Sequence, residues 1–253
     1  MNKLTKIINN TAVINLIRKV SFSFYSLVAR EPKYKLLYRP YVFWAKIKRQ
    51  KLGERADECE VFSTTDLVID GFQGSANSFV TEAFMQSQTK PVNVAHHLHS
   101  PVQIIAAVRQ QVPVWLVIRE PKGAVISLTS RWPHISVTQG LKSYIGFYSK
   151  LQQVAPYCVV STFEQNTQRL DEVIHKINHR FGTDFNLADV PHIIEQLKLK
   201  HSNPEELAKR QPLKQAKKKE FASAPNERLL SQAEEIYQTF ERLAQHTYTV
   251  SKN

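Results

Sequence analysis

The sequence predicts a three-layer α/β fold, in which a parallel β-sheet is covered by helices on both faces. After residue 60, short apolar runs alternate with longer helical stretches, which is the order that a mostly parallel sheet requires. The runs at 114–118 (VWLVI) and 157–161 (YCVVS) are largely apolar, as parallel strands buried on both faces are. At 253 residues the chain is long enough for one sizeable core.

The individual elements follow from local patterns along the chain. Strands are expected at 66–70, 92–96, 114–118 and 157–161, and helices at 77–87, 102–111, 122–131, 138–154, 166–181 and 227–245. Residues 200–225 are polar and include the run Lys217–Lys219, so we expect a flexible or ligand-ordered loop there. The organisation is therefore a helical N-terminal segment, 1–60, followed by an α/β domain, 61–253.

The N-terminal segment is basic and aromatic-rich. Within residues 1–55, thirteen Lys or Arg residues stand against two acidic ones, so this segment carries +11 of the net charge of +12. Apolar residues at helical spacing predict one amphipathic helix of about 18 residues; they are Val13, Ile17, Val20, Phe24 and Leu27. Two readings stay open: the segment contacts an anionic membrane as a peripheral element, or it packs on the domain with its basic face in water.

Several classes of protein are disfavoured by composition. No run of 18 apolar residues is present, which argues against a transmembrane helix, and Asn9, Asn10 and Asn15 interrupt any signal-peptide core. The two cysteines, Cys59 and Cys158, lack metal-ligand spacing, so we expect no metal and a reducing, cytoplasmic location. The nearly neutral main domain has no recognised nucleic-acid motif, so no nucleic-acid partner is expected.

The first candidate site is the loop after the strand at 66–70. Small residues there allow backbone N–H groups to converge on a phosphate at the start of the next helix. The spacing resembles the GxxxxGK[ST] phosphate loop, with Ala76 for the second Gly and Asn77 for the Lys. An ordinary strand–turn–helix corner explains the loop equally well. The candidate ligand-binding residues are Gln73, Gly74, Ser75, Ala76, Asn77 and Ser78.

A second candidate site follows the strand at 114–118. Arg119 stands directly after this strand, where its planar fork of donors suits a phosphate group. Pro121 is typical of the first turn of a helix, and Ser127 lies deeper in the helix that it begins. Since ligands of open parallel sheets bind at the carboxyl ends of strands, both loops are expected at one edge of the sheet.

Together these loops resemble the PAPS-dependent sulfotransferases, over residues 66–182. GFQGSANSF (71–79) is similar to that family's 5′-phosphosulfate loop, G-F-P-[KR]-S-G-T-T-[WFL], and REPKGAVIS (119–127) to its 3′-phosphate motif, R-x-P-x-x-x-x-x-S. His97 in the sequence HHL takes the place of the family's catalytic histidine, 22 residues before Arg119. CVVSTFE (158–164) is similar to a V-x-Y-E-D segment, and AEEIY (233–237) more weakly to the C-terminal helix.

The resemblance implies a P-loop NTPase-like sulfotransferase architecture and a peripheral or cytoplasmic transferase. The implied activity moves a sulfuryl group from PAPS to a hydroxyl or amine acceptor, with PAP as product; a glycan or glycolipid acceptor is compatible with the basic N-terminal segment. His97 would be the general base, with His96 and His99 as alternatives. The loop 73–78 would hold the 5′-phosphosulfate, and Arg119 with Ser127 the 3′-phosphate. The oligomeric state is not indicated.

Gly74 is the main departure from the family pattern, which has lysine or arginine at this position. The candidate cations to replace it are Lys122, Arg131, Lys214 and Lys217–Lys219. Two alternatives stay open: a P-loop kinase or NTPase, against which Asn77 argues, and a nucleotide-binding relative with impaired catalysis, which Gly74 favours.

Overall fold

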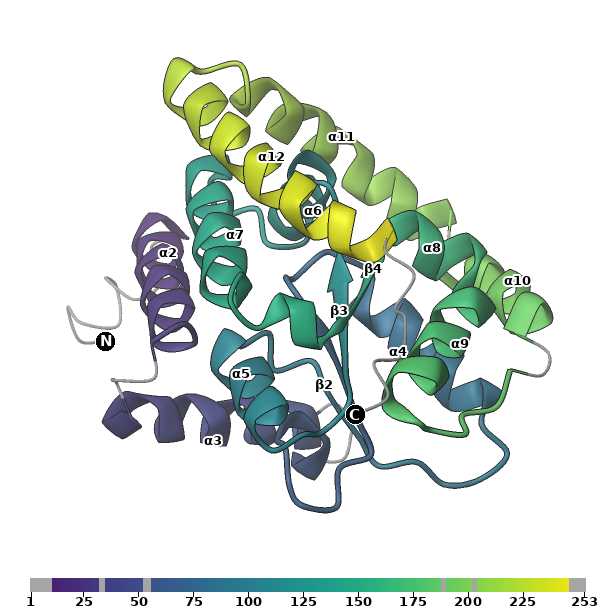
Figure 1. The fold of residues 1–253 in the computed structure, drawn as a ribbon. Coiled ribbons are helices and arrows are strands. Elements are labelled where there is room, and N and C mark those ends of the chain that lie inside the picture. The colour runs from purple at the N-terminus through teal and green to yellow at the C-terminus, as the bar shows by residue number, and fades with distance from the viewer. Residues whose placement is uncertain (1–10, 32–34, 52–55, 188–189, 202–203, 246–253) are drawn as a thin grey trace.

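A computed structural model describes residues 11–31, 35–51, 56–187, 190–201 and 204–245 (Figure 1). In chain order its elements are α2 (Thr11–Val28), α3 (Lys35–Lys51), the 3-10 helix η2 (Ala56–Cys59), β1 (Leu67–Gly71), α4 (Asn77–Ser87), β2 (Val94–His96), α5 (Pro101–Arg109), β3 (Val114–Ile118), α6 (Pro121–Arg131), α7 (Val137–Leu151), the 3-10 helix η3 (Ala155–Tyr157), β4 (Val159–Thr162), α8 (Phe163–Gln168), α9 (Leu170–Phe181), α10 (Val190–His201), α11 (Pro204–Glu220) and α12 (Ala224–Gln245).

The four strands form one parallel sheet in the order β2-β1-β3-β4. The chain passes from β1 through α4 to β2, and then through α5 past β1 to β3. These two connections lie on opposite faces of the sheet, since α4 and α5 belong to different core clusters. The direction of winding therefore reverses at β1, and the carboxyl ends of β1 and β3 flank a topological switch point, where such sheets bind ligands.

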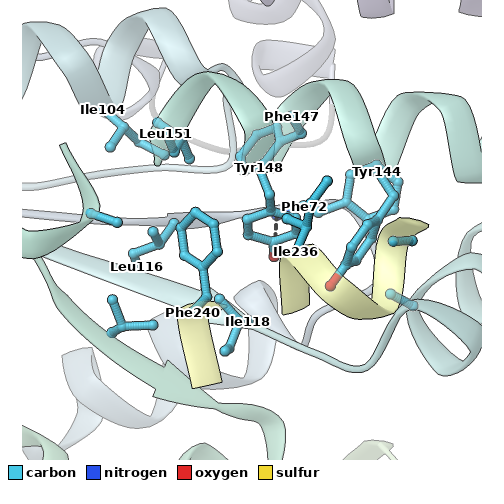
Figure 2. Close-up of a cluster of buried hydrophobic side chains, with 14 of the residues drawn as sticks. Phe72, Ile104, Leu116, Ile118, Tyr144, Phe147, Tyr148, Leu151, Ile236 and Phe240 are labelled. Carbon is cyan, nitrogen blue, oxygen red and sulfur yellow. Dashed lines mark hydrogen bonds between the residues drawn. The ribbon is translucent and has the colours of Figure 1, made fainter. Parts of the chain in front are cut away.

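Alternating strand residues supply two cores, one on each face of the sheet. Leu116 and Val160 pack beneath α5, α6, α7 and α12 (Figure 2), whereas Trp115 and Val159 pack beneath α4, α9 and α10. Because successive strand side chains point to opposite faces, an apolar run such as VWLVI fills both cores. The predicted α/β class, with a parallel sheet flanked by helices, is confirmed.

The predicted strands and most predicted helices are present, with ends shifted by up to three residues. The strand expected at 157–161 begins later, at Val159, because η3 occupies the residues before it. The helix expected at 166–181 is two helices. Thr162 and Gln165 form a capping box that starts α8 early, and Arg169, with φ of −138°, separates α8 from α9.

The prediction of a loop at 200–225 is wrong. Residues 204–220 form α11, which packs against α6, and Lys217 is buried and pairs with Glu220 at 2.6 Å. The segment is rich in Glu, Lys, Gln and Ala, which favour helix, and this preference outweighs its polarity. No helix was predicted at α10, and none separate from the first amphipathic helix was predicted at α3. α3 contains Pro40 and many basic residues, which do not indicate a helix.

The amphipathic helix expected near residues 13–27 is present as α2, and it packs on α7. Ser26 and Ser143 hydroxyls lie 2.6 Å apart, and the Gln139 amide donates to Lys19 O (3.0 Å) and Ser23 Oγ (2.9 Å). α3 packs at the turn after β2, where the Tyr41 hydroxyl donates to Leu98 O at 2.6 Å. Both helices lie at the same end of the molecule (Figure 1).

Candidate functional site

The loop after β1 turns sharply into α4 through two residues in the left-handed backbone region. Gly74 has φ of 94° and Ala76 has φ of 73°. Asn77 closes the turn, because its side-chain amide donates to Gly71 O (3.4 Å) and Phe72 O (2.9 Å). The N-cap residue Ala76 has no side chain able to bond the first N–H groups of α4. The start of this helix therefore keeps its capacity to bind an anion.

Ser75 places an unsatisfied hydroxyl in the same turn. Ser75 is fully buried. Among the described residues, its Oγ has no hydrogen-bond partner of acceptable geometry. Burial raises the pKa of Tyr148, and a side-chain interaction with Ser75 lowers it in part, so the two hydroxyls are close although their contact lacks the geometry of a hydrogen bond. Buried hydroxyls are normally hydrogen-bonded. A ligand oxygen at the loop would satisfy this one, which is consistent with a phosphate-bearing ligand.

Gly74 packs directly against α6. A Cβ atom at this position would lie 2.5 Å from Ala124 O and 3.2 Å from Ser127 Cβ. A side chain therefore cannot be accommodated unless the loop or α6 moves. The lysine or arginine of the resembled family is excluded here by the approach of α6, and any cation that serves the loop must come from elsewhere.

Substituting Gly74 by alanine is expected to destabilise the fold by about 2–6 kcal/mol, because left-handed strain and a backbone collision each cost about 1–3 kcal/mol. Gly182→Ala is the matched control, since Gly182 also has positive φ, of 66°, but no atom within 4 Å of a new Cβ. Urea denaturation of both variants measures the difference. Equal losses would show that α6 does not restrict position 74.

Arg119 brings the loop after β3 onto the loop after β1. Its Nη1 donates to Gly74 O at 3.2 Å, and its guanidinium lies 4.1 Å from the Phe163 ring centroid. Its Nε also faces Glu120 Oε1 at 3.4 Å. The guanidinium therefore stands beside the position from which the missing lysine would project, held by a carbonyl and an aromatic face.

Three of the other candidate cations are directed elsewhere. Lys122 Nζ lies over the Phe221 ring at 5.9 Å, and Arg131 over Trp132 at 5.6 Å, while Lys217 is paired within α11. Arg210, on α11, instead reaches Ser127 O and Ser130 Oγ, each at 3.5 Å. α11 thus brings a cation to the predicted 3′-phosphate serine.

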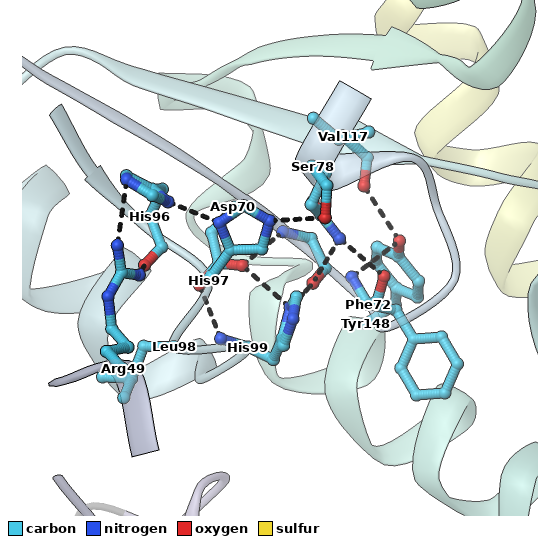
Figure 3. A network of polar contacts seen from close by, with 12 residues as sticks. Arg49, Asp70, Phe72, Ser78, His96, His97, Leu98, His99, Val117 and Tyr148 are labelled. Atoms are coloured by element: carbon cyan, nitrogen blue, oxygen red, sulfur yellow. Dashed lines mark hydrogen bonds and ion pairs between the residues drawn. The ribbon is translucent and has the colours of Figure 1, made fainter. Parts of the chain in front are cut away.

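Three histidines, the last residue of β2 and two in the turn after it, lie beside the loop 73–78 (Figure 3). His97 Nε2 lies 2.9 Å from Ser78 Oγ, and its Nδ1 is in close contact with His96 Nδ1. His96 is held from the far side by Arg49, whose Nη2 lies 3.2 Å from His96 Nε2. The structure therefore joins two predicted residues, His97 and Ser78, although they are 19 positions apart.

Burial keeps two of these imidazoles neutral. Desolvation, followed by the charges of His99 and His96, lowers the pKa of His97 to about 2. Desolvation, followed by Arg49 and His99, lowers the pKa of His96 to about 3. A neutral imidazole has a lone pair that can accept a proton, and a pKa this low makes His97 a weak base in the arrangement seen here.

Asp70 orients the third histidine. This fully buried carboxylate accepts the His99 backbone N–H at 2.8 Å, and its Oδ1 lies 3.1 Å from His99 Nδ1. His99 Nδ1 also lies 2.9 Å from Gly71 O. Both His97 and His99 adopt positive φ, of 60° and 53°, so this turn holds conformations that non-glycine residues rarely adopt.

A cavity opens beside the site between the N-terminal helices and α7. Gln73 and His99 from the site face this cavity, together with Tyr25 of α2, Arg30 in the turn after α2, Tyr41 of α3 and Phe147 of α7. Its lining mixes aromatic rings with polar groups, and its volume of about 70 Å³ is smaller than that of sites that enclose a whole organic ligand. Of the three histidines, His99 is the one that lines it.

The predicted site residues thus gather at one edge of the sheet. Residues 73–78, His97, Arg119 and Ser127 all lie around the carboxyl ends of β1, β2 and β3. Asp70, Tyr148, Phe163 and Arg210 were missed. For Asp70 a signal existed, because a carboxylate that ends a buried strand needs a partner; Tyr148, Phe163 and Arg210 depend on packing that the sequence does not reveal.

Within the described ranges, no group of three or more His, Cys, Asp or Glu residues is arranged to hold a metal ion. Comparisons of the chain with protein-family models, with curated proteins and with solved structures find no match.

Proposed function

We propose that this chain is a PAPS-dependent sulfotransferase with a P-loop-like architecture. The observation that carries the proposal is the convergence, at the switch point of a parallel sheet, of an uncapped helix start, an unsatisfied buried hydroxyl and the Arg119 guanidinium. The loop 73–78 would hold the 5′-phosphosulfate, and Arg119 and Ser127 the 3′-phosphate. Arg210 supplies further positive charge beside Ser127.

The proposed reaction is an in-line displacement at sulfur. The acceptor oxygen or nitrogen forms a bond to sulfur while the bond from sulfur to the 5′-phosphate oxygen breaks, and PAP leaves. The acceptor proton passes to a histidine. The chain's own contribution is positioning and stabilisation of charge on the leaving 5′-phosphate, which would come from the uncapped N–H groups at the start of α4 and not from a side chain at position 74.

His97 is the proposed base because it contacts the donor loop through Ser78. Acceptance of a proton requires its contact with Ser78 or His96 to open when substrate binds. His99 is the alternative that the cavity favours, since Asp70 orients its Nδ1 and the ring faces the space where an acceptor would lie.

Two alternative functions can be compared with the proposal by means of residues in the loop 73–78. A P-loop kinase needs a lysine where this chain has Asn77, and here the Asn77 amide is used to hold the turn together. A nucleotide-binding relative without catalysis is favoured by the steric exclusion of any cation at Gly74.

Calorimetry with PAP and ATP tests the donor site. We expect PAP to bind more tightly than ATP, and Arg119→Ala to weaken PAP binding by about 1.5–3 kcal/mol, roughly 10- to 150-fold, because a charged hydrogen-bond donor is lost. Arg109→Ala is the control, since this exposed arginine ends α5 near the opposite edge of the sheet. Equal PAP affinity for the wild type and Arg119→Ala would remove the assignment.

A further inference from the structure

Exposed apolar side chains are concentrated on the two N-terminal helices. Of the sixteen large hydrophobic residues that are exposed in the described chain, ten belong to α2 and α3. Single exposed hydrophobic residues are ordinary on protein surfaces, but such a concentration marks an interaction surface.

On α2 the apolar stripe points away from the domain. Leu16, Val20 and Phe24 follow one another at intervals of four residues, so they share a helix face, and they are 61%, 61% and 46% exposed. The face toward α7 includes Ser23 and Ser26, which hydrogen-bond there. The helix thus docks through a partly polar side and presents apolar residues to solvent.

α3 repeats this arrangement. Tyr41 and Val42 pack on the turn after β2, whereas Leu36, Phe43 and Trp44 are 89%, 62% and 59% exposed. The two helices are joined by the Tyr25 and Tyr41 rings, whose centroids are 6.1 Å apart. The two helices therefore lie next to each other at one end of the molecule (Figure 1).

The positive charge around these faces indicates which kind of partner they bind. Arg18, Lys19, Arg39 and Lys51 are exposed on the two helices, and neither helix contains an acidic residue. Two copies of so basic a surface would repel each other, whereas an anionic surface would attract it. Basic residues beside Leu, Phe and Trp are the combination that binds at the interface of an anionic bilayer.

We propose that the outward faces of α2 and α3 dock on anionic lipid bilayers and hold the protein at a membrane surface. In the described part of the chain, no helix is both long and apolar enough to cross a bilayer, so docking takes place in the interfacial plane. The proposal rests on the surface of these helices and is independent of the donor site.

Co-sedimentation of the full chain with vesicles of phosphatidylcholine containing 30% phosphatidylserine tests the docking face. The wild type is expected to bind at physiological salt, and Leu16→Gln/Val20→Gln/Phe24→Gln to bind at least tenfold more weakly, because its apolar contacts are lost. Leu199→Gln/Tyr157→Gln is the matched control: these side chains are 75% and 62% exposed but lie on other faces.

A second pair of variants tests the charge. Arg18→Gln/Lys19→Gln/Arg39→Gln is expected to weaken vesicle binding at least tenfold, whereas Lys90→Gln/Arg109→Gln/Lys218→Gln removes as many exposed charges elsewhere and is expected to leave binding unchanged. Circular dichroism shows that each variant is folded. Equal binding by all variants, or no binding by the wild type, overturns the proposal. A dimer that the apolar variant abolishes, without vesicle binding, assigns the face to a second copy and also overturns it.

Discussion

His97→Ala is expected to lower sulfuryl transfer from PAPS by roughly 100- to 10,000-fold, the usual contribution of a positioned general base, while PAP still binds. His97 touches Ser78 in the first turn of α4, so it is the histidine next to the proposed donor loop. The measurement is transfer of radiolabelled sulfate from PAPS to a phenol, a sugar and a long-chain alcohol, alongside calorimetry with PAP.

His99→Ala is the comparison that decides between the two histidines. His99 lines the cavity and is oriented by Asp70, so with His97 as base its loss is expected mainly to raise the KM for the acceptor. The reverse pattern, with kcat lost in His99→Ala and wild-type-like turnover in His97→Ala, would transfer the role of base to His99.

Acidification from pH 8 to pH 5 is expected to reduce the free energy of unfolding by about 4 kcal/mol through His96 and His97. Their native pKa values are about 3 and about 2, below the value of about 6.5 for an unfolded histidine. The unfolded chain therefore binds protons first as the pH falls below about 6.5, and stability is present above that pH and lost below it. At pH 5 each histidine contributes about 2 kcal/mol of this loss.

Urea denaturation at pH 8, 6 and 5 measures the effect. His96→Asn should flatten the pH profile by about half, because one of the two depressed groups is removed. His192→Asn is the control, as this histidine is exposed on α10. A wild-type profile that is flat over this range would show that these imidazoles are not held neutral by the fold.

The parallel sheet could be predicted because its signal is local. Val114–Ile118 is apolar on both faces and bounded by Pro113 and Arg119, so its burial in two cores follows from composition alone. The helix α11 could not be recognised in this way. Its residues favour helix, but its polar sequence does not show which face packs, because its contacts with α6 and the burial of Lys217 depend on how distant segments meet.

In the candidate site too, features with a local sequence signal could be predicted, whereas those that depend on contacts between distant segments could not. The loop 71–78 and Arg119 were predicted from their positions after strands, and the structure places them 3.2 Å apart at their contact. The sequence shows that position 74 has glycine in place of a basic residue, but it does not show why. The reason is the approach of Ala124 O, a steric constraint between residues 50 positions apart.

Residues of the N-terminal segment line the cavity, which limits how the chain can be truncated. Tyr25, Arg30 and Tyr41 line the cavity, and Arg49 holds His96 through its backbone oxygen and ring. A truncation that starts after residue 50 would therefore remove part of the cavity wall and a support of the histidine turn, as well as the basic helices. For protein engineering, the N-terminal segment is not an appendage to be trimmed for crystallisation or expression, and its roles are separable only by point substitution.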